Sequence, residues 1–246
     1  MFRFENIQNK KILKSDLIKN AHAFFTTRDL FLLSKEEKQP QAVEENRKVI
    51  CDYFNIPLEN LITPEQTHSC NIDIAQKGKS YPNTDGLILT DPNLAIFLNF
   101  ADCTPLIFYD EKQNIGAVSH AGWRGTEQKI GVLTIEKLVN DFNSKLEDIK
   151  ILIGPAICKN CYHVQDDVYK KLKNTVKDFA TLYEIKNNQI FVDLKNINKQ
   201  QFIEIGIPSE NIDVCNFCTC CDNDLFFSYR NENKTAKRHN AVLKLL

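Results

Sequence analysis

Alternating apolar runs and turn-forming groups predict a row of β-strands in the middle of the chain. Between Asp85 and His120 the apolar segments GLILT, LAIFLNF, PLIFYD and NIGAVSH are separated by DPN, ADCTP and EKQN, which are typical of turns. LAIFLNF is apolar almost throughout instead of alternating, which indicates a strand covered on both faces. ILIG, QIFVDL and NIDVC add strands later in the chain. The pattern therefore predicts the inner layers of an α/β structure.

Helical spacing of apolar residues predicts helices around these strands. The periodic segments are Val43 to Phe54, Val132 to Phe142, Val168 to Phe179 and Asn196 to Ile205. Residues 29–45 are charged and largely without a period, so we expect a surface loop there. The chain shows no internal repeat and no Pro/Gly/Ser-rich linker. We therefore expect one domain over residues 1–246.

Charge and cysteine content narrow the function classes. The 31 basic and 32 acidic residues leave a formal charge of -1, which argues against general nucleic-acid binding and against attachment to an anionic membrane. No run is apolar for long enough to form a signal peptide or a membrane span. The 9 cysteines are an odd number, which fits free thiols and metal ligands better than a disulfide framework. We expect a cytoplasmic protein that acts on small molecules.

Three segments offer metal ligands. PEQTHSC, NFADCTP and SHAGWRG place His68, Cys103 and His120 beside turn residues at or after apolar runs. Two imidazoles and one thiolate, with the fourth position left open, are the ligand set of a catalytic zinc ion. The three residues form no local motif, so separate roles remain the alternative. In that case Cys103 is a buried thiol, His68 caps a turn and His120 bonds to the backbone.

Longer motifs resemble the laccase-domain family, which includes the bacterial YfiH-like proteins. The segments that carry the resemblance are EQTHS, IGPAICKNCYHV, CTCCDNDLFFSYRNENKTAKR, and TDGLILTDPNLAIFLNFADCTPLIFYD followed by IGAVSHAGWRGT. The likeness covers essentially the whole chain. It implies a mixed α/β fold in four layers, α/β/β/α with mixed sheets, similar to the cytotoxic necrotizing factor fold. It also implies that His68, Cys103 and His120 bind the metal, with zinc expected and copper as the alternative. Ser69 departs from the family pattern, which has glycine after the first metal-site histidine.

The resemblance implies a purine-nucleoside enzyme of the cytoplasm. The implied reactions are phosphorolysis of adenosine, inosine and methylthioadenosine to the base and a pentose 1-phosphate, and deamination of adenosine. Cys103 and His120 are then catalytic residues as well as metal ligands. Deamination also needs a group that moves protons, and Asp102 is the nearest carboxylate in sequence. A structural acceptor is an equal alternative for Asp102, because neighbouring residues of an extended chain point to opposite faces.

Phosphorolysis requires a phosphate site, and the planar fork of arginine pairs two phosphate oxygens at once. Arg124 is the preferred candidate because it lies in the same turn as His120, and Arg28 and Arg230 are the others. Trp123 would stack on the base or pack under the turn. Gln66 is a further candidate for substrate contact.

Other functions use the same residues. A cysteine hydrolase or amidase would use His120 to activate Cys103 as the nucleophile, and a link to peptidoglycan precursor editing is attached to bacterial members of the family. A copper polyphenol oxidase is the older family label, but oxygen reduction by several coppers needs more histidines than the 5 present. A non-catalytic adaptor that uses the metal only for stability is the third alternative.

Two C-x-x-C pairs form a separate question. Cys158 with Cys161 and Cys218 with Cys221 offer four thiolates for a structural zinc ion. The gap between the pairs greatly exceeds the roughly 15–20 residues typical of a zinc ribbon. The sequence therefore favours buried cysteines that act as small apolar side chains, with Cys220 or Cys221 as an exposed thiol.

Overall fold

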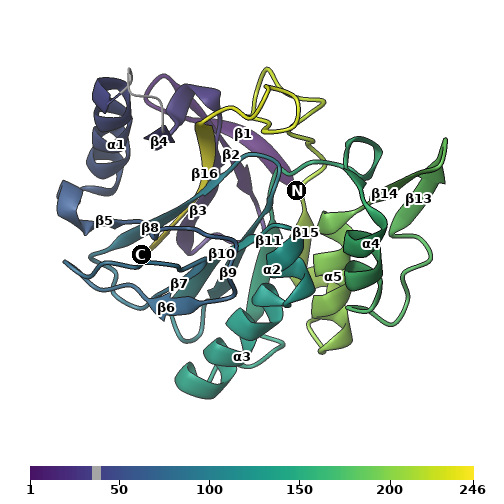
Figure 1. The fold of residues 1–246 in the computed structure, drawn as a ribbon. Helices are drawn as coiled ribbons and strands as arrows, with labels where there is room; N and C mark the ends of the chain where they lie inside the picture. Colours follow the sequence, from purple (N-terminus) through teal and green to yellow (C-terminus); the bar gives the residue numbers. More distant parts are fainter. Residues whose placement is uncertain (35–39) are drawn as a thin grey trace.

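Two large β-sheets stack face to face. The computed structural model describes residues 1–34 and 40–246. The first sheet contains, in spatial order, β1 (Phe2–Ile7), β2 (Lys10–Ser15), β3 (Ala21–Thr26), β16 (Lys237–Leu245), β8 (Ala95–Phe100) and β5 (Leu61–Ile62), with β4 (Leu33–Ser34) beside β16. Its strand pairs are antiparallel except β5 with β8. The chain termini thus contribute most of this sheet (Figure 1).

The second sheet contains β15 (Ile212–Val214), β11 (Ile149–Ile153), β9 (Thr104–Asp110), β10 (Ile115–Ala121), β7 (Gly86–Leu89) and β6 (Ile72–Ile74), in that order. It is also mixed, because β15 runs parallel to β11 and β6 runs parallel to β7. The strands predicted between Asp85 and His120 are all present. They are divided between the sheets, since β8 joins the first and β7, β9 and β10 join the second.

Helices cover the outer faces and complete four layers. They are α1 (Pro40–Phe54), α2 (Trp123–Glu127), α3 (Ile130–Phe142), α4 (Asp166–Lys173) and α5 (Leu194–Glu204). Ile50 and Phe54 of α1 pack on the first sheet, and Ile135 of α3 and Phe202 of α5 pack on the second. The largest apolar cluster lies between the sheets. This arrangement confirms the mixed α/β, four-layer prediction and explains why LAIFLNF is apolar on both sides.

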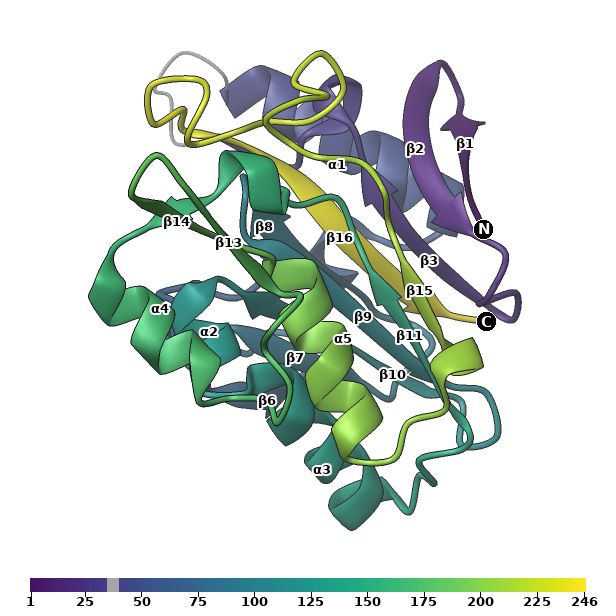
Figure 2. The same ribbon diagram turned by 90° about the vertical axis from the view of Figure 1, so that its right-hand side faces the viewer.

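A small third sheet stands beside α4 and α5 (Figure 2). It consists of β12 (His163–Val164), β14 (Gln189–Val192) and β13 (Tyr183–Lys186). The described residues also contain the 3-10 helices η1 (Arg28–Leu30), η2 (Leu58–Asn60), η3 (Lys159–Cys161) and η4 (Ser209–Asn211).

Two of the local predictions need correction. The surface loop predicted over residues 29–45 is largely wrong, because η1, β4 and α1 occupy much of it; residues 35–39 lie outside the described residues. The helix predicted from Val168 to Phe179 is shorter, since α4 ends at Lys173 and a turn follows. Across the described parts of the chain, no helix is long and apolar enough to cross a membrane.

Candidate metal centre

Strand pairing brings two of the predicted ligands to one sheet edge. His120 lies near the end of β10, and Cys103 directly precedes β9. The antiparallel register of these strands sets His120 opposite Pro105 and Ala121 opposite Thr104, so Cys103 emerges beside His120. The third ligand, His68, lies in the loop between β5 and β6. Side chains that are distant in sequence therefore meet because the second sheet aligns its strand ends.

The three donor groups are close enough to share one ion. Cys103 Sγ lies 3.8 Å from His68 Nε2, and the two imidazole centroids are 4.8 Å apart. One donor atom from each of the three residues lies within 4.8 Å of the others. His120 is buried, Cys103 is half-buried and His68 is exposed. The group is therefore anchored in the core on one side and open to solvent on the other.

A buried carboxylate, Asp85, organises two of the ligands. It directly precedes β7, and its own backbone carbonyl accepts a hydrogen bond from His120 N at 2.8 Å. Its carboxylate accepts bonds from the backbone N–H groups of Thr67 (3.1 Å), His68 (3.1 Å) and Ser69 (2.7 Å). The Ser69 hydroxyl adds a fourth bond at 2.8 Å. The loop that carries His68 is thus wrapped around one carboxylate.

Asp85 also sets the proton position on His120. Its Oδ1 lies 2.7 Å from His120 Nδ1. Burial opposes ionisation, but hydrogen bonds and charge from His120, with the bonds from Ser69 and Thr67, lower the pKa of Asp85 to about 2. The carboxylate therefore accepts, and Nδ1 carries the proton. This leaves Nε2 of His120 free to bind a metal, which is the usual carboxylate–histidine–metal arrangement.

Cys103 and His120 favour each other's charged forms. Burial opposes ionisation of the thiol, but the charge and hydrogen bonds of His120 and His68 lower the pKa of Cys103 to about 6. Burial likewise opposes protonation of His120, but Cys103 and Asp85 raise its pKa to about 9. A thiolate is the form of cysteine that binds metals and acts as a nucleophile. The geometry consequently supports both chemistries that the sequence suggests.

The backbone around the ligands is shaped for close approach. His68 and Asp102 have positive φ angles of 65° and 82°, a conformation that costs a non-glycine residue about 1–2 kcal/mol. Gly122 directly follows β10, and a Cβ atom there would lie 2.9 Å from Cys103 Sγ and 3.1 Å from His68 Cδ2. Only a glycine leaves these side chains in place.

Asp102 serves as a structural acceptor in this arrangement. Its Oδ1 accepts a bond from Thr219 Oγ1 at 2.7 Å, and its Oδ2 accepts one from Arg230 N at 2.6 Å. Its backbone carbonyl accepts a bond from Ile157 N at 3.0 Å. These contacts favour the structural alternative, because both carboxylate oxygens are engaged by segments far away in sequence. Its role in proton transfer stays a prediction.

The predicted substrate contacts occupy different surroundings. Arg124 is exposed on α2, with its guanidinium carbon 4.3 Å from the centre of the Trp123 ring. Trp123 packs against the cluster formed by α4 and the third sheet. Gln66 exchanges hydrogen bonds with the backbone of Asn99, at 2.8 and 2.9 Å. Gln66 therefore ties the loop of His68 to β8.

The other two arginines differ in how fully they are engaged. Arg28 bonds to Glu232 at 2.7 Å and to the carbonyls of Asn223 and Phe226. Arg230 is exposed and reaches the carbonyl of His163 at 3.3 and 3.4 Å. Arg28 thus supports the carboxy-terminal loop, whereas the Arg230 side chain faces solvent.

Sequence reasoning missed three residues of the site: Asp85, Tyr162 and Arg238. Burial and then the charge of Cys103 raise the pKa of Tyr162. Burial lowers the pKa of Arg238, against the charges of Cys103, Tyr229 and Asp102. Asp85 was detectable in principle, since a carboxylate is one of the usual partners of a metal-bound histidine. Tyr162 and Arg238 had no such signal.

The donor set fits a single zinc ion better than a multicopper centre. In the described ranges, His68, Cys103 and His120 are the one histidine-containing group close enough to hold an ion. His239 is fully buried beside Phe100 and Phe226 and is not part of this group. Several coppers would need further converging histidines. A tetrahedral ion with one exchangeable position matches the two imidazoles and the thiolate.

Comparison with known proteins finds a family match and curated relatives. The family model described as multi-copper polyphenol oxidoreductase laccase matches residues 25–245. The chain is 32% identical over 207 residues to purine nucleoside phosphorylase YlmD of Bacillus subtilis, covering 79% of this chain and 74% of that protein. It is 29% identical over 201 residues to adenosine deaminase RL5 from an unknown prokaryotic organism, covering 76% of each.

A solved structure supports the fold over the full length. The hypothetical protein YfiH of Bacillus licheniformis superposes with a TM-score of 0.90 at 29% identity, covering 100% of this chain and 99% of that one. The family match, the relatives and the shared architecture agree with the resemblance seen in the motifs. The chain therefore belongs to the multi-copper polyphenol oxidoreductase laccase family, the laccase-domain group of YfiH-like proteins.

Proposed function

We propose that this protein is a zinc-dependent purine-nucleoside enzyme of the cytoplasm. It would cleave adenosine, inosine and methylthioadenosine with phosphate, and deaminate adenosine. The observation that carries the proposal is the meeting of His68, Cys103 and His120 at one solvent-facing sheet edge, with Asp85 behind them. Relatives named as a purine nucleoside phosphorylase and an adenosine deaminase support the substrate class.

The chain's own residues divide the work. Asp85 fixes the His120 imidazole and the His68 loop, so that neither has to reorganise when substrate enters. A zinc ion bound by the three ligands would supply a Lewis acid that makes water acidic near neutral pH. Arg124 and Arg230 are exposed guanidinium groups that would bind phosphate, and Arg238, whose charge interacts with that of Cys103, would add a third cation. Trp123 would present a ring face to the base.

Product analysis tests this proposal. The zinc-loaded protein is incubated with adenosine, with and without phosphate, and adenine, inosine and hypoxanthine are resolved by chromatography. We expect adenine and ribose 1-phosphate only when phosphate is present, and inosine in both mixtures. Cys103→Ala should lose bound metal at this centre and both activities while it stays folded. Cys51→Ala, a buried cysteine of α1 on the far side of the first sheet, is the matched control and should keep both.

A cysteine hydrolase or amidase is the second candidate. The thiolate–imidazolium pair of Cys103 and His120 favours it, because a lowered thiol pKa and an adjacent base activate a cysteine nucleophile. Chelation separates the candidates. A metal-free preparation that keeps full activity, and that loses it when an alkylating reagent modifies Cys103, would establish the hydrolase. Turnover of peptidoglycan precursors without any turnover of nucleosides would reject the nucleoside proposal.

A further inference from the structure

The two C-x-x-C segments lie side by side although Cys158 and Cys218 are 60 positions apart. One segment follows β11 and the other follows β15, and these strands are parallel, with Ile153 opposite Val214. Backbone bonds continue this pairing beyond the strands, from Cys215 N to Ile153 O at 2.8 Å and from Thr219 N to Ala156 O at 3.3 Å. The parallel pairing therefore brings together two C-x-x-C segments whose separation in the sequence argued against a shared site.

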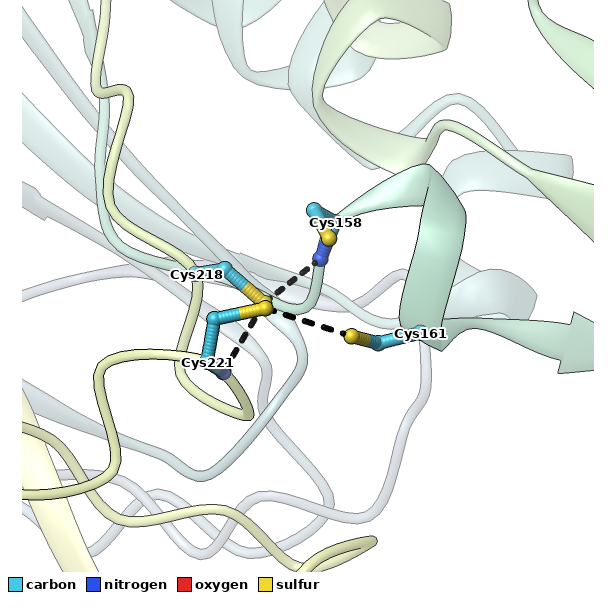
Figure 3. Close-up of side chains that lie close together, drawn as sticks. All are labelled: Cys158, Cys161, Cys218 and Cys221. Atoms are coloured by element: carbon cyan, nitrogen blue, oxygen red, sulfur yellow. Dashed lines mark hydrogen bonds between the residues drawn. The ribbon is translucent and has the colours of Figure 1, made fainter.

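The four sulfur atoms have the spacing of a single-ion site (Figure 3). The sulfurs of Cys158, Cys161, Cys218 and Cys221 all lie within 4.8 Å of one another, and the Cys161–Cys221 pair is 3.4 Å apart. Zinc–sulfur bonds of about 2.3 Å in a tetrahedron place the sulfurs about 3.8 Å apart. That value falls between the two observed limits, so small side-chain adjustments would complete the coordination.

Each C-x-x-C segment is already folded as a turn that points its sulfurs inward. Cys161 N and Tyr162 N both donate to Cys158 O, at 3.1 and 3.0 Å. Two backbone N–H groups point at Cys218 Sγ, from Cys158 at 3.2 Å and from Cys221 at 3.4 Å. N–H donors aimed at a sulfur stabilise its anionic form. The backbone is therefore arranged to receive a thiolate.

Further contacts hold the second segment in place. The buried Lys195 ammonium donates to the carbonyls of Cys215 and Phe217, at 2.6 and 3.0 Å. Cys218 N donates to the carboxylate of Asp222 at 2.8 Å. The segment that enters the cluster is therefore fixed by groups that are not themselves ligands.

We propose that Cys158, Cys161, Cys218 and Cys221 bind one zinc ion in a closed tetrathiolate site, separate from the centre at His68, Cys103 and His120. Four protein ligands leave no open position, which is the pattern of a structural zinc ion. Such a site also explains why four cysteines gather in one place, although the large hydrophobic core can form without disulfides or a structural metal.

The site would connect to the first centre through Asp102. Thr219, between the two cysteines of the second segment, donates to Asp102 Oδ1 at 2.7 Å. Ile157, next to Cys158, donates to Asp102 O at 3.0 Å. Asp102 in turn precedes the metal ligand Cys103. An ion that clamps both C-x-x-C segments therefore holds the two supports of the loop that presents Cys103.

Other chemistry at these thiols would leave different signatures. A disulfide between Cys161 and Cys221 needs an oxidant and leaves two thiols unused. An iron–sulfur cluster surrounds several iron atoms and needs its cysteine sulfurs farther apart than a single ion does. The observed spacing favours one ion.

Zinc counting on the full chain tests the proposal. The double variant Cys103→Ala/His120→Ala removes the first centre. It is purified with reductant, loaded with zinc, freed of excess metal and analysed by native mass spectrometry. We expect two zinc ions per wild-type chain and one per chain of the double variant. Adding Cys158→Ser/Cys161→Ser should remove the last ion, whereas adding Cys220→Ser, a cysteine of the same segment outside the four, should not.

Cobalt(II) loading of the Cys103→Ala/His120→Ala variant gives a readout that does not depend on whether the C-x-x-C variants fold. We expect the thiolate-to-cobalt charge-transfer absorption of a tetrathiolate ion. A folded Cys103→Ala/His120→Ala variant that binds neither zinc nor cobalt would overturn the proposal. So would zinc retention by the Cys103→Ala/His120→Ala variant after Cys158→Ser/Cys161→Ser is added. A brown, iron-containing protein would also overturn it, as would a protein purified without reductant whose mass is lower by two hydrogens and which cannot take up metal.

Discussion

Replacing Asp85 by asparagine removes the charge behind the metal ligands at almost constant size. The side chain is fully buried, and its carboxylate accepts bonds from His120 Nδ1 and from the backbone of Thr67, His68 and Ser69. An asparagine cannot satisfy all of these donors. If its oxygen faces His120, its NH₂ group meets the N–H groups of Thr67 and Ser69. If it is flipped, the NH₂ group faces Nδ1, and the proton of His120 must move to Nε2, where it blocks the metal.

The magnitude follows from the environment of Asp85. The lowering of its pKa from 3.8 to about 2 corresponds to about 2.5 kcal/mol of favourable interaction with the ionised form. This stability is present above pH 3.8 and is lost as the pH falls toward 2, so the stability gap between wild type and Asp85→Asn should narrow over that range. Loss of the carboxylate partner of a metal-bound histidine should weaken zinc binding by about 10–100-fold.

Competition with a chromogenic chelator measures the zinc Kd, and thermal unfolding measures stability. Asp110→Asn is the matched control. Asp110 is equally buried and accepts two backbone N–H bonds, but it lies at the end of β9 that is far from Cys103. We expect Asp110→Asn to lower Tm and leave the zinc Kd of the first centre unchanged. Both variants are compared in the Cys158→Ser/Cys161→Ser background as well, so that the second cluster cannot mask the result. An Asp85→Asn protein that loses stability and keeps the wild-type Kd would refute the reasoning.

Three further substitutions test separate parts of the site. Gly122→Ala should displace Cys103 and weaken zinc binding about 10-fold or more in the same chelator assay, because the new Cβ would overlap the sulfur; an unchanged Kd would mean that the ligands move without cost. Arg124→Ala should raise the KM for phosphate more than the KM for adenosine, and equal changes would assign Arg124 to another role. Glu232→Gln should cost at most about 3 kcal/mol at pH 7, because Arg28 and nearby hydrogen bonds overcome burial and lower the pKa of Glu232 from 4.5 to about 2. That loss should shrink in unfolding experiments as the pH falls from 4.5 toward 2, and a gap that stays constant would contradict the assignment.

Local patterns in the sequence predicted the strands and helices whose apolar residues follow a clear period. The helices at Val43, Val132 and Asn196 and the strands from Gly86 to Ala121 are present, with ends shifted by a few residues. Sheet membership was not accessible, because β8 pairs with β16 from the far end of the chain. The strand β16 itself escaped prediction. It contains charged residues and the buried His239 and Asn240, and the amide NH₂ of Asn240 donates to Leu98 O and Asn99 Oδ1 of β8.

The candidate site shows the same division. His68, Cys103 and His120 were recognisable because their residue types are metal ligands and their motifs resemble a family. Asp85 was overlooked because an aspartate next to a glycine is typical of a turn. The convergence of Cys158 with Cys218 depends on the parallel pairing of β11 and β15, which no local motif encodes.

Anomalous diffraction at the zinc edge from zinc-loaded crystals tests the central claim most directly. We expect an anomalous peak about 2.0–2.3 Å from His68 Nε2, His120 Nε2 and Cys103 Sγ, with water or substrate in the fourth position. The account would be contradicted if no peak appeared among these three residues, or if a fourth protein side chain closed the coordination sphere.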